Sequence, residues 1–194
     1  MDIRKSAFAA TGIVLAAGGV QAQDKLLIVD LSVENEITIT ATAGLSGATV
    51  SGSDTTGFLL ADFFNTAGPG IFAAGTGDLT SAANPSDSGP DLFNSSATPA
   101  GGSFGLNVFS YTADATSDFV AGSQAFSGSA TFSLAADDYA AALAGNSSGT
   151  IYAFADTDDD IAAATALGTW NLIPAPSTAA MLGLGGLVAA RRRR

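Results

Sequence analysis

The chain has 194 residues, no Cys and no His, and a net charge of −11. These absences exclude a Ser-His-Asp triad and a cysteine nucleophile, and they mean that no disulfide can form. Between residues 23 and 173 there are 17 acidic residues and a single basic one, Lys25, which gives this segment a net charge of −16. Such a segment is expected to repel nucleic acid and anionic membrane surfaces.

The first 22 residues have the three parts of a secretory signal. Arg4 and Lys5 form a basic start, residues 7–20 are rich in Ala, Gly, Val and Leu, and small or apolar residues lead to Ala22. This order predicts an N-terminal signal helix and cleavage after Ala22 by signal peptidase. The alternatives are an uncleaved anchor, for which the apolar run is short, and a buried N-terminal helix.

Alternation of apolar and polar residues with period two predicts β-strands in the middle of the chain. The clearest stretch is 126–134, where Phe, Gly, Ala, Phe and Leu alternate with Ser and Thr. Two further stretches, 27–34 and 37–42, show the same pattern. Weaker candidates are 106–109, 151–155 and 167–172.

Clusters rich in Gly, Pro and Ser at 68–70, 84–90 and 97–102 predict loops between these strands. Two short helices are predicted over 135–143 and 159–166, because Asp residues near their first turns suit a helix N-terminus. Strands with one apolar face and loops of this kind favour two packed sheets. The predicted fold is therefore all-β, an antiparallel and jelly-roll-like β-sandwich with one or two short helices.

The stretch 156–160 contains four Asp residues. Alternate carboxylates in a loop can chelate Ca²⁺, which points to Asp156, Asp158 and Asp160 as metal ligands. The EF-hand pattern is not met, since Ile161 and Leu167 stand where Gly and Glu would be needed. The competing interpretation is a solvated acidic turn without metal. We predict no cofactor, with calcium at these three residues as the alternative.

The chain ends in three successive segments. Pro174, Ala175 and Pro176 come first, residues 177–190 are uncharged, and Arg191, Arg192, Arg193 and Arg194 close the chain. The uncharged segment predicts a transmembrane helix about 21 Å long at about 1.5 Å per residue. The arginines are expected to remain in the cytoplasm, which leaves residues 23–173 outside.

This tripartite tail resembles the PEP-CTERM sorting domain, in which a Pro-Glu-Pro-like motif precedes a short apolar helix and an Arg cluster. The resemblance covers only the tail, and Ala175 stands where the family most often has Glu. It implies processing near the motif by an exosortase-like membrane enzyme after transient anchoring in the cytoplasmic membrane. Release or transfer to the cell surface or an exopolysaccharide matrix would follow. The alternative is a permanent C-terminal anchor.

The predicted domains are a signal peptide (1–22), an extracytoplasmic β domain (23–173) and a sorting tail (174–194). The β domain has no P-loop and no dinucleotide-binding glycine motif in a strand-to-helix context. We predict an exported, surface- or matrix-associated protein with a structural or adhesive role and no enzymatic activity. Its predicted partners are signal peptidase, the exosortase-like enzyme, the inner membrane and exopolysaccharide, but no nucleic acid.

Three alternative functions remain open at this point. The first is a carbohydrate- or calcium-binding extracellular module. The second is a secreted glycoside-active enzyme, since such enzymes need only two suitably placed carboxylates. The third is an ice-binding protein, suggested by the row formed by Thr38, Thr40 and Thr42.

Overall fold

The computed structural model describes residues 23–66, 68–84, 90–94, 104–110 and 115–173. The predicted signal peptide and sorting tail lie outside these residues. The described residues contain one α-helix, α1 (Ala136–Leu143), and one 3₁₀ turn, η1 (Asp158–Asp160). The strands are β1 (Lys25–Asp30), β2 (Glu36–Ala41), β3 (Val50–Ser53), β4 (Phe58–Leu60), β5 (Ile71–Gly77), β6 (Thr80–Ser81), β7 (Asp91–Asn94), β8 (Leu106–Phe109), β9 (Thr116–Phe119), β10 (Phe126–Ser127), β11 (Ser129–Ser133), β12 (Ser148–Ala153) and β13 (Thr165–Ile173).

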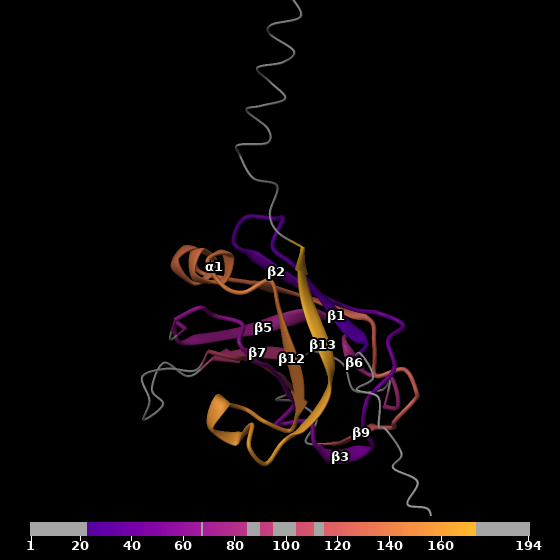
Figure 1. The fold of residues 1–194 in the computed structure, drawn as a ribbon. Coiled ribbons are helices and arrows are strands. Elements are labelled where there is room, and N and C mark those ends of the chain that lie inside the picture. The colour runs from indigo at the N-terminus through magenta and orange to yellow at the C-terminus, as the bar shows by residue number, and fades with distance from the viewer. Residues whose placement is uncertain (1–22, 67, 85–89, 95–103, 111–114, 174–194) are drawn as a thin grey trace, which may run out of the picture.

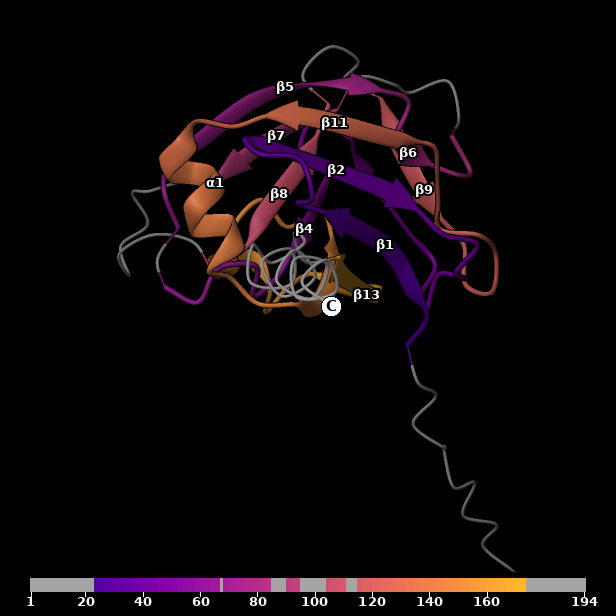
Figure 2. The ribbon, with the colours of Figure 1, turned by 90° about the horizontal axis from the view of Figure 1, so that it is seen from above.

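Nine strands form a closed barrel in the order β1-β13-β12-β4-β8-β7-β5-β11-β2 (Figures 1 and 2). The ring closes because β2 pairs with both β1 and β11. The β1–β13 pair is parallel, and the other pairs of the ring are antiparallel. Two small sheets, β3–β9 and β6–β10, accompany the barrel.

The all-β class predicted from the sequence is confirmed, but the strands form one ring and not the two separate sheets of a sandwich. The difference lies in pairing: β1 has a hydrogen-bonded neighbour on each side, so neither of its edges is left open. Alternation of apolar residues specifies which face of a strand is buried. It does not specify which strand lies beside it.

The best-patterned stretches behave as predicted. In β1, Leu27 and Val29 are fully buried, and Leu31 directly after it is buried as well, whereas Val33 is exposed. The stretch 126–134 buries its apolar side chains, but Gly128 divides it into β10 and β11. Gly128 has a φ of +79°, and a Cβ there would lie 2.3 Å from the Asp78 carbonyl oxygen. A glycine is therefore required at this bend.

Trp170 of β13 is the largest fully buried side chain of the core. Its indole Nε1 donates a hydrogen bond to the Ala61 carbonyl oxygen at 3.0 Å, and its ring centroid lies 5.2 Å from that of Phe63. Gly149 on β12 leaves the necessary space, since a Cβ there would lie 2.6 Å from Nε1. The core is therefore both apolar and satisfied in its hydrogen bonds at this point.

The helix predicted over 135–143 is confirmed as α1, which packs beside one end of the barrel (Figures 1 and 2). The helix predicted over 159–166 is wrong: the chain makes only the short turn η1 and then enters β13 at Thr165. Thr165 and the residues after it have their hydrogen-bonding partners on β12, which overrides a weak helical pattern. No helix in the described part of the chain has the length and apolar character needed to span a bilayer.

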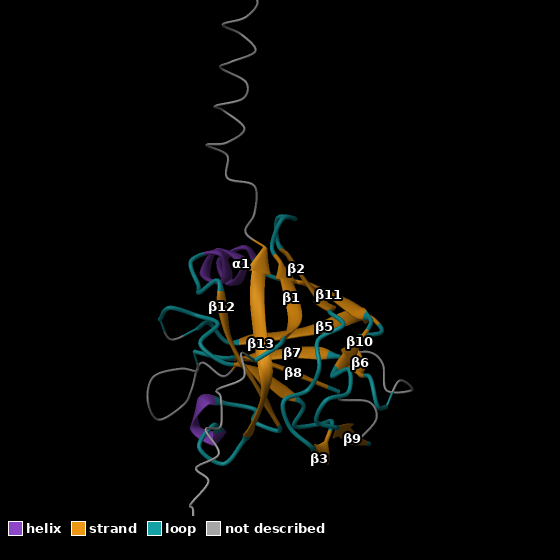
Figure 3. Cartoon of the chain, turned by 45° about the vertical axis from the view of Figure 1, so that its right-hand side comes forward, coloured by secondary structure: helices purple, strands orange, loops and turns teal. Residues whose placement is uncertain are grey.

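The two ends of the barrel differ in what they carry. β13 runs from the end that bears η1 and the β3–β9 sheet to the end where the described chain finishes at Ile173 (Figures 1 and 3). We call the first the turn end and the second the tail end. Asp30 of β1 pairs with Ile173, and α1 lies at this same tail end.

Candidate functional site

Three phenylalanines on neighbouring strands share the outer face of the barrel. Phe72 of β5 pairs with Phe93 of β7, and Phe93 in turn pairs with Asn107 of β8. Because side chains alternate along a strand, Phe109 of β8 lies on the same face as Asn107. The Phe109 ring centroid is 6.3 Å from that of Phe72 and 6.4 Å from that of Phe93.

These side chains form a pocket near the turn end, which we call the aromatic pocket. It has a volume of about 240 Å³, and its other lining residues are Thr55, Asn107 and Asp156. Phe72 is 65% exposed, an unusual state for so large an apolar side chain, whereas Phe109 is buried. A mostly apolar pocket with a few polar groups at its edge is the usual composition of a ligand-binding site.

Asn107 connects the segments that line this pocket through hydrogen bonds. Its side chain is buried, and Nδ2 donates hydrogen bonds to the Thr56 carbonyl at 2.9 Å and the Ala155 carbonyl at 3.1 Å. It thereby connects β8 to the loop before β4 and to the chain just after β12. In the sequence Asn107 interrupts an apolar run, and only the folded structure shows that its side chain is buried against the backbone carbonyls of neighbouring segments.

In the acidic turn at 156–160, two of the four carboxylates form a pair and a third contacts another segment of the chain. The Asp156 and Asp160 side chains are hydrogen-bonded, and this bond raises the pKa of Asp156, helped by partial burial and the Asp160 charge, and lowers the pKa of Asp160. The Asp158 carboxylate instead accepts hydrogen bonds from the backbone N–H groups of Phe104 and Gly105.

The structure therefore brings two of the three predicted calcium ligands together and directs the third to another element. Among the described residues there is no group of three acidic, His or Cys side chains that could hold a metal ion. Calcium at Asp156, Asp158 and Asp160 remains a prediction. As a glycosidase pair, Asp156 and Asp160 are too close, since such carboxylates are about 5 Å or more apart.

Two of the three threonines in the row at 38, 40 and 42 form hydrogen bonds with other parts of the protein. Thr38 Oγ1 is 2.8 Å from Thr131 Oγ1 on β11, and Thr42 Oγ1 donates to the Leu26 carbonyl oxygen. Thr40 is exposed. Two of the three hydroxyls thus have protein partners and do not form a free flat array. The predicted sorting-tail and cleavage residues lie outside the described part of the chain: Ala22, Pro174, Ala175, Pro176, Arg191, Arg192, Arg193 and Arg194.

In comparisons with known proteins, no protein-family model, no curated protein and no solved structure matches this chain. What defines the class of protein is therefore its own architecture. It is an all-β protein whose described residues build a nine-stranded closed barrel. An aromatic pocket and an acidic turn lie side by side near one end, sharing Asp156.

Proposed function

We propose that this protein is exported and displayed at the bacterial cell surface or in the extracellular matrix, where its role is structural or adhesive and not catalytic. The placement of charge carries the proposal: every basic residue except Lys25 belongs to a terminal segment with the composition of a signal helix or of a transmembrane sorting tail. The barrel closes between Lys25 and Ile173, so the folded unit fits between these two segments.

The direction of β13 adds to this proposal. If the tail is held in the cytoplasmic membrane, the tail end of the barrel faces the membrane and the turn end points away from it. From Thr165 to Ile173, at about 3.3 Å per residue, β13 places the turn end roughly 26 Å further out. The aromatic pocket would then be presented to the surroundings, as an adhesive surface must be.

Mass spectrometry of the mature protein from its host tests the export and sorting steps. We expect a new N-terminus at Gln23, from cleavage by signal peptidase, and a C-terminus near Pro174 to Pro176, from an exosortase-like enzyme. A mature chain that still ends in Arg194 would contradict processing of the tail while leaving export intact. A chain that keeps residues 1–22 would contradict cleavage of the signal.

The aromatic pocket favours a second, compatible candidate, which is binding of carbohydrate such as the exopolysaccharide of the matrix. Sugar rings have apolar C–H faces that pack against aromatic rings, and hydroxyl groups that need hydrogen-bond partners. Phe72 and Phe93 offer the rings. Asp156 and Thr55 offer a carboxylate and a hydroxyl at the edge, and these groups accept or donate hydrogen bonds to sugar hydroxyls.

Substitution of Phe72 by Ala tests this candidate. The Phe72→Ala variant should bind host exopolysaccharide about tenfold more weakly in affinity gel electrophoresis, which corresponds to loss of one aromatic contact of about 1–1.5 kcal/mol. Phe104→Ala is the matched control, because Phe104 is 41% exposed but does not line the pocket. Equal retardation of both variants and the unmodified protein would count against carbohydrate binding at this pocket.

A further inference from the structure

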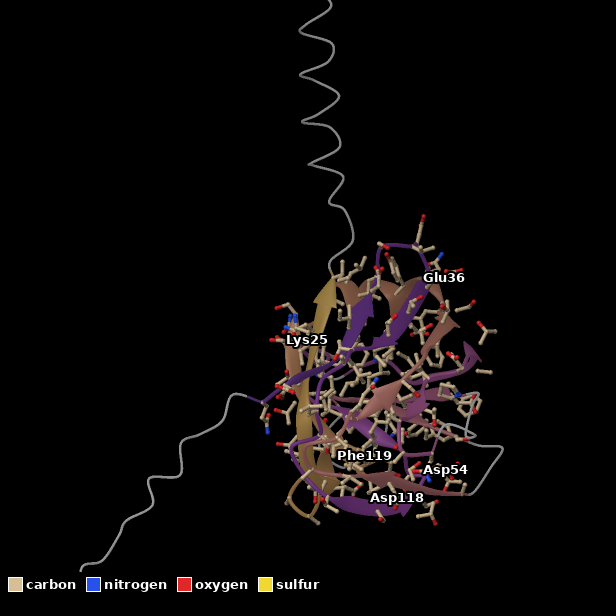
Figure 4. The ribbon with its side chains drawn as sticks, turned by 90° about the vertical axis from the view of Figure 1, so that its right-hand side faces the viewer. Lys25, Glu36, Asp54, Asp118 and Phe119 are labelled. Carbon is tan, nitrogen blue, oxygen red and sulfur yellow. The ribbon has the colours of Figure 1, made fainter. Side chains whose placement is uncertain are left out.

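A buried carboxylate lies in a second cavity close to the turn end. Asp54, which follows β3, is only 4% exposed, and within the described part of the chain neither of its carboxylate oxygens has a hydrogen-bond partner. The same holds for Ser110 Oγ, which is also buried. Both residues line a cavity of about 40 Å³ that shares Phe109 with the aromatic pocket. Figure 4 shows Asp54 in this region, near Phe119 of the same cavity wall.

The backbone fixes Asp54 in this position from both sides. Its N–H donates to the Ala115 carbonyl at 3.0 Å, and its own carbonyl accepts from the Ser110 N–H at 2.9 Å. These bonds fix the backbone of Asp54, and its side chain is buried in the same place. Asp54 and Ser110 are therefore held against the same cavity by the loops that enter and leave the barrel.

The polar side chains of the cavity wall supply oxygen atoms only. They belong to Asp54, Thr80, Ser81, Ser110 and Ser117. The Thr80 hydroxyl donates its proton to the Asn84 carbonyl at 3.1 Å, and the Ser81 hydroxyl donates to the Asp118 carbonyl at 2.5 Å. Ser81 Oγ also accepts a hydrogen bond from the Ala83 N–H at 3.3 Å. With their protons committed elsewhere, each of these two hydroxyl oxygens keeps at least one lone pair for an electron-poor ligand.

In the part of the chain that the structure describes, no basic side chain is placed to neutralise Asp54. Lys25 is the one basic residue between 23 and 173, and Figure 4 shows it well apart from Asp54. An unpaired carboxylate is costly to bury, and a bound cation relieves that cost. The strongly acidic barrel raises the local concentration of cations, which favours binding of such an ion.

We propose that this cavity binds one hard metal cation, Ca²⁺ or Na⁺, with the Asp54 carboxylate and the Ser110 hydroxyl as side-chain ligands. Such ions take carboxylate, hydroxyl and water oxygens. The cavity exceeds the roughly 10–15 Å³ that one water needs, so it has room for an ion and an accompanying water. The site is separate from the acidic turn at 156–160 and stands independently of the proposed adhesive role.

Thermal unfolding of the chelator-treated full chain in a mild detergent tests the proposal, with CaCl₂, NaCl and choline chloride compared at equal ionic strength. Relative to choline, the binding cation should raise Tm by about 5–10 °C when present at about 100 times its Kd. Asp54→Asn should show the same Tm in all three salts. In choline its Tm should equal or exceed that of the unmodified protein, because the buried charge is gone.

Asp156→Asn is the matched control and should keep the full response to the cation. Isothermal titration calorimetry gives a second measurement: one ion per unmodified chain and none for Asp54→Asn. The proposal is overturned if neither Ca²⁺ nor Na⁺ raises Tm, or if Asp54→Asn keeps the response. Loss of the response in Asp156→Asn alone would place the ion at the acidic turn and overturn it too. None of these outcomes affects polysaccharide binding by Phe72, so the two proposals fail separately.

Discussion

At the scale of single residues, Tyr139 fastens α1 to the barrel. Its buried hydroxyl donates a hydrogen bond to the Leu31 carbonyl oxygen at 2.6 Å. Burial raises the pKa of Tyr139, and the negative charges of Glu34 and Asp30 raise it further. The folded protein therefore favours the neutral phenol of Tyr139. The packing of α1 against the barrel is expected to weaken at a pH high enough to ionise this group.

Tyr139→Phe should lower the free energy of unfolding by about 1–3 kcal/mol at neutral pH, because the Leu31 carbonyl loses a buried partner. Above about pH 10 the unfolded chain releases the Tyr139 proton while the folded chain retains it, so the unmodified protein loses stability as pH rises. The difference in the free energy of unfolding between the unmodified protein and Tyr139→Phe should therefore become smaller at alkaline pH. Urea unfolding followed by circular dichroism at neutral and alkaline pH measures it, with Tyr152→Phe as control. A difference that does not change with pH would contradict the assignment.

At the scale of elements, the acidic turn carries a pH-dependent pair. The raised pKa of Asp156 means that stability from this group is present at low pH and lost as pH rises above 3.8, the ordinary Asp value, through the raised pKa. The lowered pKa of Asp160 acts oppositely: its contribution is lost as pH falls below that value. Once both carboxyl groups are ionised, no proton remains for the hydrogen bond between them, and their negative charges repel each other.

Asp156→Asn should relieve this repulsion, since an amide can donate to Asp160 without a titrating proton. We expect a gain in the free energy of unfolding of less than about 1 kcal/mol at neutral pH, because the pair is solvent-screened, and a smaller gain near pH 4. Asp159→Asn removes one charge from the same turn outside the pair and serves as control. Thermal unfolding across this pH range gives the comparison, and identical pH profiles for the two variants would exclude a special pairing.

The elements also show how far the sequence predicts the fold. β2 and the stretch around β10 and β11 were predictable, because Ile39 and Phe132 lie between polar neighbours and repeat with period two. β1 was predictable as the start of the longer alternating stretch 27–34. β5 was not, since Ile71–Gly77 consists largely of Gly and Ala and has no clear alternation. Its strand conformation comes from pairing with β7 and β11, which is a long-range effect.

The candidate sites also differ in whether a local sequence pattern or only the folded structure reveals them. The acidic turn was visible in the sequence because its Asp residues are adjacent. The aromatic pocket was not, because Phe72, Phe93 and Phe109 are distant in sequence and meet only through strand register. Asp54 belongs to no sequence motif, and only its burial in the folded chain distinguishes it.

At the scale of the whole molecule, the two ends of the barrel carry different features. α1 and Ile173 occupy the tail end, whereas the aromatic pocket, the acidic turn and the Asp54 cavity cluster toward the turn end. With a net charge of −16 over residues 23–173, self-repulsion opposes close packing of copies unless cations are present. A bound cation at Asp54 would remove part of that charge from the turn end.

The position of β13 also determines how the molecule would carry mechanical load. A pull between a ligand held in the aromatic pocket and a tail fixed in the membrane would act along β13. This strand pairs with β12 between Thr165 and Asn171 and with β1 between Thr169 and Ile173, so every part of it has at least one neighbour. Its ladder hydrogen bonds lie across the pulling direction, so they would be strained together in shear and would not open one after another. The strand that leads to the proposed anchor is thus held on both sides against extraction.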